Sequence, residues 1–313
     1  YVYTILASRD ISFKLGSSIR QVGALVQDRP ACIVGHLGKA ARMVPVSVRF
    51  TNAVTKREEK FDFEVTPNRI FFTQMIIYAM KESFARAEAT LGQNTKRYTM
   101  TVKIKGMEPW SYSDVIAGFD GGFQRQLIGL LDRPLNHMTQ RPEFESFHLE
   151  VEVEHRDRRA YIMNVTASRE EVRPGQKVTL RVALETKDGG DALERTLDVV
   201  IPHDAPEGNY VITVLGGDFV PADVAQPRDI ADYPKLYAGF YKSTELVALL
   251  PTGRVDLSLE GRLLRDLPLS AVARLVRSPG GKNMQLKPVT EKVRQKVPFV
   301  VASQQKVTLR VTR

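Results

Sequence analysis

Side chains that could act in nucleophilic catalysis occur in this chain, but their spacing selects no catalytic set. A serine peptidase needs a serine nucleophile, a histidine base and a carboxylate that orients the base. The 5 histidines are His36, His137, His148, His155 and His203. The candidates for a triad are His36, or His203 with its neighbour Asp204, combined with Ser8, Ser12, Ser17 or Ser18. Because no spacing favours one of these combinations, we predict no catalytic residue.

Patterns that bind metals or phosphates are also missing from the sequence. No pair of histidines has the HExxH spacing or a comparable one. The glycine-containing segments KLGSSIRQVG (14–23) and DGGFQRQLIG (120–129) lack the offsets of phosphate-binding and dinucleotide-binding loops. A GxSxG nucleophile elbow is absent as well. The sequence therefore predicts neither a metal nor a cofactor.

The chain has a single cysteine, Cys32, which excludes an internal disulfide and a zinc cluster built from cysteines. Cys32 lies in the apolar run ACIVG (31–35), so we expect a buried and unreactive thiol. One cysteine suits the cytosol and a bacterial envelope equally well.

The net charge of +9 does not by itself indicate nucleic-acid binding. The 45 basic residues are spread along the chain and mixed with 36 acidic ones, and the densest runs, TKREEK (55–60) and EHRDRRA (154–160), contain both signs. No platform of alternating aromatic and basic residues occurs, so nucleic acid is an unfavoured partner. The longest apolar run (70–80) is shorter than the ~20 residues that span a bilayer, so we predict no transmembrane segment.

The fold predicted from the periodicity is mainly β with inserted helices (α+β). At about 100–200 residues per domain, 313 residues suggest two or three domains. We expect a β-rich portion at 1–155, a β-sandwich at 156–220 and a small strand-rich region at 221–313. The first residues, YVYTIL (1–6), already resemble a strand and lack an initial Met, so we expect the chain to be part of a longer protein.

In the first portion the hydrophobic period changes from 2 to 3.6 and back. The segment EKFDFEV (59–65) alternates as a half-buried strand. A helix is predicted over 67–91, with Thr66 as its N-cap and Pro67 at its first position. A second helical patch is predicted over 114–131, interrupted by two glycines and ended by a proline.

Two further alternating segments, 96–106 and 144–155, are predicted to be strands. Glu150, Glu152 and Glu154 form an acidic stripe opposite Val151 and Val153. We interpret this stripe as a solvated outer face rather than a cation site.

Short strands separated by the turn signals 173–175, 188–190 and 205–208 predict the sandwich. Its pattern is immunoglobulin-like without a cysteine pair or a core tryptophan. In the C-terminal region, LSAVARLVRS (269–278) is predicted to be a short helix and QKVTLRVTR (305–313) the last strand.

Several of these strings together resemble the later part of the SpoIVB-type serine peptidase domain. The matching positions are Ser12-Phe13-Lys14, Gly23, Asp28-Arg29, Gly35, Gly38, Met43-Val44-Pro45-Val46 and Phe61-Asp62-Phe63-Glu64-Val65. The strings EVRPGQKVTL (171–180), VVIPHDAPEGNY (199–210), STELVALL (243–250) and VASQQKVTLRVTR (301–313) are similar to longer envelope proteins that carry this domain.

The family's catalytic strings are absent here. Its nucleophile lies in a GMSGSP-like turn and its histidine in an FGHP-like turn, and both precede the region that matches this chain. The VGH string (34–36) aligns with a later turn that holds no catalytic histidine. The resemblance therefore implies a supporting sheet, with Gly23, Gly35 and Gly38 in tight turns or close backbone packing and Asp28-Arg29 as a structural pair or turn.

Two functions remain open on the sequence. The first is the non-catalytic downstream portion of a SpoIVB-like serine peptidase, which supports the protease domain and positions a substrate or partner protein. The alternative is a non-enzymatic binding or scaffold protein of the cell envelope that assembles with itself or with partners through exposed strand edges. The resemblance implies an extracytoplasmic location in a bacterium, in the periplasm or envelope, for either function.

Overall fold

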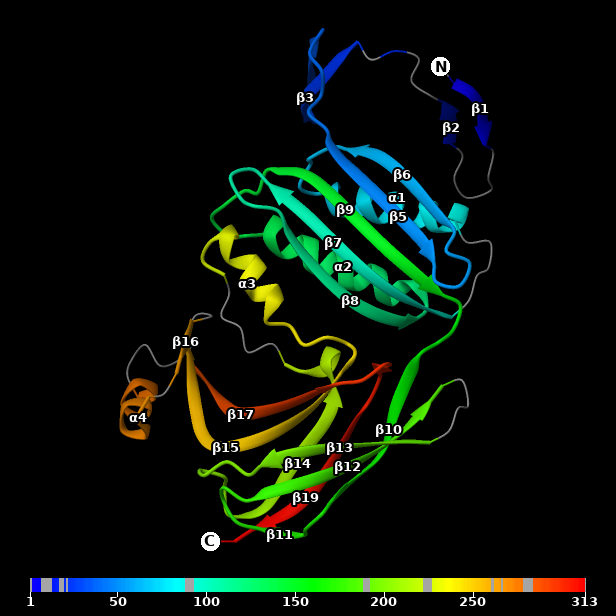
Figure 1. The fold of residues 1–313 in the computed structure, drawn as a ribbon. Coiled ribbons are helices and arrows are strands. Elements are labelled where there is room, and N and C mark those ends of the chain that lie inside the picture. The colour runs from blue at the N-terminus through cyan, green and yellow to red at the C-terminus, as the bar shows by residue number, and fades with distance from the viewer. Residues whose placement is uncertain are drawn as a thin grey trace.

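The computed structural model describes residues 2–6, 13–16, 20, 22–87, 93–187, 192–221, 227–259, 262–265, 267–277 and 284–312. The protein is mainly β, with 52% strand and 19% helix, and includes a sheet curled into a half-barrel. This confirms the predicted mainly β class with inserted helices. Figure 1 shows an upper sheet backed by helices and a lower group of strands, with the N-terminal hairpins above the upper sheet.

The upper unit is built on a five-stranded sheet of order β6-β5-β9-β7-β8. Its strands are β5 (Val44–Asn52), β6 (Glu58–Val65), β7 (Asn94–Ile104), β8 (Trp110–Gly118) and β9 (Phe144–Glu154). The helices α1 (Phe72–Ala87) and α2 (Asp120–Leu135) cover one face of this sheet (Figure 1). The strands predicted at 59–65, 96–106 and 144–155 are thereby confirmed.

Alternation along the strands creates this one-sided core. In β7 the side chains of Tyr98, Met100 and Val102 are buried toward the helices, because successive residues of a strand point to opposite faces. On the open face, the hydroxyls of Thr99 and Ser113 lie 2.9 Å apart across the β7–β8 pair. The acidic stripe on β9 also lies on the open face. It is paired with basic side chains at Arg49–Glu150, Lys56–Glu152, Arg97–Glu152 and Arg158–Glu154.

The predicted start of the first helix was wrong. Thr66 and Pro67 do not cap it, because the chain first makes a turn held by Asn68. The Asn68 side chain accepts a hydrogen bond from the Ile70 N–H (2.9 Å), and its carbonyl accepts one from Phe72. Asparagine favours such local turns over helical continuation. The predicted end at residue 91 lies outside the described residues.

The second helical patch was also misplaced. Residues from Asp114 to Gly118 belong to β8, since they pair in register with β7 from Tyr98 to Asn94. Helix α2 begins only at Asp120, so Gly121 and Gly122 lie in its first turn and do not interrupt it. Strand pairing has overridden the local helical pattern here.

The lower unit consists of two sheets that share one buried core. One sheet has the order β13-β12-β10-β18, and the other has the order β11-β19-β14-β15-β16 with β17 paired to β15. Their bounds are β10 (Arg159–Ala167), β11 (Glu171–Val172), β12 (Lys177–Thr186), β13 (Leu193–Val200), β14 (Gly208–Gly216), β15 (Glu245–Leu259), β16 (Arg262–Leu264), β17 (Met284–Lys296), β18 (Val300–Val301) and β19 (Gln304–Val311). The core therefore joins strands from both of the predicted segments 156–220 and 221–313.

The remaining elements are short. They are β1 (Val2–Leu6), β2 (Phe13–Gly16), β3 (Gly23–Arg29), β4 (Cys32–Leu37), the 3-10 helices η1 (Gly217–Phe219) and η2 (Ile230–Asp232), and the helices α3 (Tyr233–Ala238) and α4 (Leu269–Arg277). Helix α4 and strand β19 confirm the predicted helix at 269–278 and the predicted last strand. None of the helices in the described ranges is long and apolar enough to cross a membrane.

Helix α3 returns from the lower unit to the core of the upper one. Pro134 lies in the last turn of α2 and has no N–H to donate to the carbonyl of Leu130. The hydroxyl of Tyr237 donates to that carbonyl instead, at 2.6 Å, and the hydroxyl of Tyr233 donates to the carbonyl of Arg133 at 2.9 Å. Two tyrosine hydroxyls of α3 therefore donate hydrogen bonds to backbone carbonyls in the last turns of α2.

We predict that Tyr237→Phe destabilises the protein by about 1–2 kcal/mol, because the buried carbonyl of Leu130 would lose its donor. Urea unfolding at neutral pH measures this difference. The matched control is Tyr78→Phe, which removes a hydroxyl from a side chain that is 63% exposed. Equal unfolding midpoints for the two variants would contradict the role given to Tyr237.

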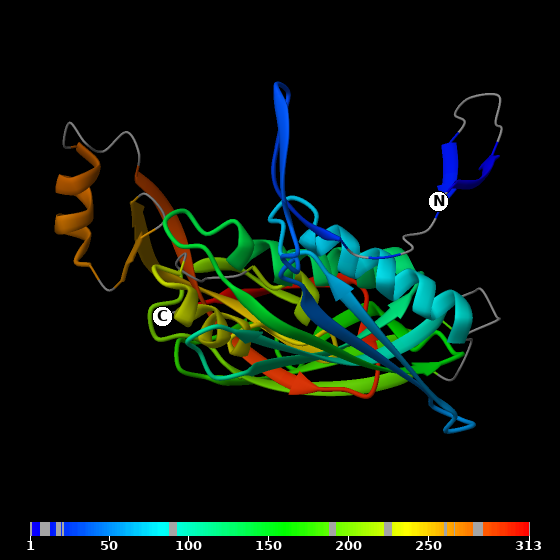
Figure 2. The same cartoon turned by 90° about the horizontal axis from the view of Figure 1, so that it is seen from above.

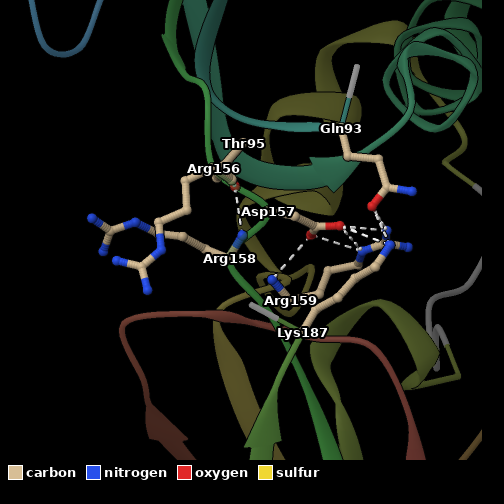
Figure 3. A network of polar contacts seen from close by, with 7 residues as sticks. All are labelled: Gln93, Thr95, Arg156, Asp157, Arg158, Arg159 and Lys187. Atoms are coloured by element: carbon tan, nitrogen blue, oxygen red, sulfur yellow. Dashed lines mark hydrogen bonds and ion pairs between the residues drawn. The ribbon is translucent and has the colours of Figure 1, made fainter. Parts of the chain in front are cut away.

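The connection between the units is held by a charged cluster, which we call the junction network (Figure 3). Asp157 is only 5% exposed and lies between β9 and β10. Its carboxylate accepts hydrogen bonds from Arg159 Nε at 2.9 Å and from Arg159 Nη2 at 2.6 Å, and it lies 3.1 Å from Lys187 Nζ. Gln93 accepts hydrogen bonds from both cations.

Burial by itself raises the pKa of the Asp157 carboxyl, but the hydrogen bonds from Arg159 and Lys187 outweigh it and hold the pKa below its ordinary value. Asp157 is therefore charged at neutral pH and neutralises two cations. Next to it, the Thr95 hydroxyl donates to the carbonyl of Arg156 at 2.6 Å and accepts from the N–H of Arg158 at 2.9 Å. These contacts fix the path of the chain as it leaves the upper sheet.

We predict that Asp157→Asn lowers the free energy of unfolding by about 2 kcal/mol. Breaking a fully buried pair costs more, but Arg159 and Lys187 keep some solvent contact that screens their charges. Urea unfolding at pH 7 measures the loss. Asp62→Asn, which breaks the exposed pair with Lys60, is the control and should leave the midpoint unchanged. Similar midpoints for both variants would show that the junction network is not stabilising.

Candidate functional site

The glycines and the charged pair singled out in the sequence lie in or next to the hairpin formed by β3 and β4. Asp28 and Arg29 are exposed near its tip, opposite Ile33 and Cys32. At Gly23 the strands approach closely, since a Cβ atom there would lie 2.2 Å from the carbonyl oxygen of His36. Gly38 follows the hairpin and has a φ of 73°. Gly35 lies in β4 and packs beside Leu25.

This hairpin exposes an unusual amount of apolar surface. Leu25, Ile33 and Leu37 are 75%, 65% and 87% exposed, and Val22, Val26 and Val34 are also exposed. Figure 2 shows the hairpin rising away from the body of the molecule, on the side of the sheet that carries α1. An isolated two-stranded hairpin is marginally stable in water, and clustered exposed apolar side chains mark interaction sites. The exposed apolar side chains of the hairpin therefore form a candidate interaction surface.

The prediction that Cys32 is buried was wrong, because its thiol is exposed on β4. The apolar run around it forms a projecting strand instead of a core strand. The local pattern is the same in both cases, and only the tertiary arrangement distinguishes them.

We predict that Cys32 in the folded protein reacts fully with Ellman's reagent, at the same rate as after unfolding in guanidinium. The physical reason is that a thiol on a projecting hairpin is reached by the reagent without any opening of the fold. A thiol that reacts only after unfolding would contradict the exposed position of the hairpin.

Only the histidine and aspartate candidates of the triad lie among the residues that the structure describes. Ser8, Ser12, Ser17 and Ser18 lie outside the described residues. His36 is exposed on the hairpin, and His203 with Asp204 is exposed in a turn before β14. His148 and His155 are exposed, and His137 is buried with its ring near the carbonyl of Pro227. Within the ranges that the structure describes, no three His, Cys, Asp or Glu side chains form a potential metal site.

A cleft that the sequence did not predict lies between helix α2 and the lower unit. We call it the α2–η1 cleft, and its volume is about 740 Å³. Helix α2 forms one wall, and η1 with the segment after α3 forms the other. Its lining includes Tyr112, Arg125, Arg133, Asp218, Phe240 and Tyr241.

Asp114 anchors the inner end of this cleft without lining it. Its carboxylate accepts hydrogen bonds from the Tyr112 hydroxyl at 3.0 Å, the Val115 N–H at 2.8 Å, the Gln126 amide at 3.2 Å and the Ser243 N–H at 3.1 Å. Ser243 lies 129 residues from Asp114 in the sequence, so this carboxylate joins the two walls.

Two further charged groups lie close to Asp114. Asp218 keeps contact with solvent, yet the surrounding walls desolvate its carboxyl, and this effect together with the charge of Asp114 raises its pKa to about 7. Burial lowers the pKa of Lys242, although Asp114 and Glu245 favour its charged form. The ammonium of Lys242 lies 3.5 Å from the centre of the Tyr112 ring.

Comparison with known proteins found no family model, no curated protein and no solved structure that matches this chain. Sequence reasoning missed the cleft because its walls meet only in the folded chain. The one local signal is DGGFQRQLIG (120–129), which is no phosphate-binding loop but forms part of the α2 wall.

Proposed function

We propose that this chain is the non-catalytic downstream part of a SpoIVB-like serine peptidase in a bacterial envelope. In this proposal the β3–β4 hairpin packs against the peptidase part of the same protein. The immunoglobulin-like pair of sheets in the lower unit then positions a substrate or a partner protein.

The observation that carries this proposal is the uncovered apolar hairpin. Its strands contain Gly23, Asp28-Arg29 and Gly35, which belong to the strings that resemble the peptidase domain. A strand pair that belongs to a larger β domain would bury Leu25, Ile33 and Leu37 in that domain. No described part of this chain covers them.

The first test is labelling with a fluorophosphonate, which reacts with activated serines. We expect the full-length gene product to be labelled and the 313-residue chain to remain unlabelled, because the proposed nucleophile lies outside this chain. Labelling of the 313-residue chain would contradict its non-catalytic role. A full-length product that stays unlabelled would contradict the peptidase.

The second test addresses the hairpin. We expect Ile33→Asp to reduce fluorophosphonate labelling of the full-length product about tenfold, since a buried charge at the contact would separate the hairpin from the peptidase part. The same variant of the 313-residue chain should unfold like the wild type, because Ile33 is exposed there.

The control is Val54→Asp, in the turn between β5 and β6, where the side chain is 78% exposed. Equal labelling of the Ile33 and Val54 variants would show that the hairpin does not dock on the peptidase part.

The alternative is a non-enzymatic scaffold protein of the envelope, and the same hairpin supports it. In that case the apolar strands would pair with a second copy or with another envelope protein. This alternative predicts that fluorophosphonate labels neither the 313-residue chain nor the full-length gene product. It also predicts self-association or partner binding that Ile33→Asp abolishes.

A further inference from the structure

The α2–η1 cleft has the size and the lining of a ligand site, independently of the hairpin. Its volume of about 740 Å³ falls within the range of roughly 300–1,000 Å³ that holds small ligands. Two glycines on the same face of α2, Gly122 and Gly129, line one wall. At Gly129 a Cβ atom would meet nothing within 4 Å, so the missing side chain leaves the cleft open there, at a cost of up to about 1 kcal/mol relative to alanine in a helix.

The lining of the α2–η1 cleft is rich in positive charge. Arg125, Arg133 and Lys292 line it. Among the described residues, no acidic side chain forms an ion pair with Arg125 or Arg133. The guanidinium of Arg133 lies 5.2 Å from the ring centre of Phe240, and the ammonium of Lys292 lies 5.6 Å from that of Tyr241. Cations and aromatic faces are thus presented together.

The acidic side chains at the site attract a ligand of opposite charge less strongly than the basic ones do. Asp114 is already satisfied by its own donors, and it lies behind the wall rather than in it. Asp218 lines the cleft, but with a pKa of about 7 it is largely neutral below that pH. The lining therefore favours an anion over a cation, and the apolar and aromatic walls favour a ligand with an apolar body.

We propose that the α2–η1 cleft binds a carboxylate with an apolar body, with the carboxylate at Arg133 and the body against Phe240 and Tyr241. Two sources share this chemistry: the C-terminus of a peptide that ends in an apolar residue, and a free aromatic or aliphatic acid. Guanidinium groups suit carboxylates because they donate in a planar, bidentate manner.

The experiment is calorimetric titration of the 313-residue chain with four probes. They are N-acetyl-Ala-Ala-Leu-Phe with a free carboxylate, the same peptide as its C-terminal amide, 1-naphthoate, and 1-naphthylmethylamine as the matched cation. We expect at least one carboxylate to bind, and the amide and the amine to bind about tenfold more weakly or worse.

The probes separate the two sources. Binding of the peptide acid alone identifies a peptide C-terminus, and binding of naphthoate alone identifies a free organic acid. Either result, or both together, supports the proposal. Binding of neither acid, or equal binding of the amide or the amine, overturns it.

Variants at Gly129 locate the bound probe. A Cβ atom at Gly129 meets nothing within 4 Å, so Gly129→Phe should fill the cleft and abolish binding without straining α2. Gly129→Ala is the matched control and should bind like the wild type. The double variant Arg125→Ala with Arg133→Ala changes only exposed side chains and should lose affinity about tenfold or more. Unchanged binding in the Phe variant or in the double variant overturns the assignment.

Discussion

One backbone carbonyl in α2 is the point to which α3 is bound, next to the contacts that hold the two units together. Pro134 cannot donate to the carbonyl of Leu130, and a buried carbonyl without a donor is costly. The hydroxyl of Tyr237 fills this position and thereby holds α3 against α2. The chain that leaves α3 then reaches Asp114, where Ser243 donates its N–H, and β15 begins two residues later. The proline in α2 thus leaves a carbonyl that ties α3, and the segment after it, to one wall of the α2–η1 cleft.

The strands of the upper sheet could be predicted because their information is local. Alternation at Tyr98, Met100 and Val102 indicates a one-sided strand whatever the partner. The predicted helix from Asp114 failed for the opposite reason, since its assignment depends on pairing with β7. The prediction that Cys32 is buried was wrong for a similar reason, because an apolar run looks the same in a core strand and in a projecting strand. Local patterns identify elements well, and they do not show what covers them.

The α2–η1 cleft was beyond prediction for a related reason. Asp114 and Ser243 are separated by 129 residues, and no spacing rule connects them. Arg125, Gly129 and Arg133 recur at helical spacing, but this is also the pattern of an ordinary solvated face. Only the opposite wall, contributed by η1 and by Phe240 after α3, turns that face into a cleft.

The hairpin and the cleft differ in how much of their shape the chain itself determines. The cleft walls are cross-linked by Asp114 and by Tyr237, both of which bind groups from the other side. Walls held in this way have their shape without a ligand, so little conformational entropy would be lost when a ligand binds. The β3–β4 hairpin has two strands and no described cover over Leu25 or Ile33. The hairpin thus lacks the internal contacts that fix the shape of the cleft, and this is why the proposal assigns the hairpin to assembly and the cleft to reversible binding.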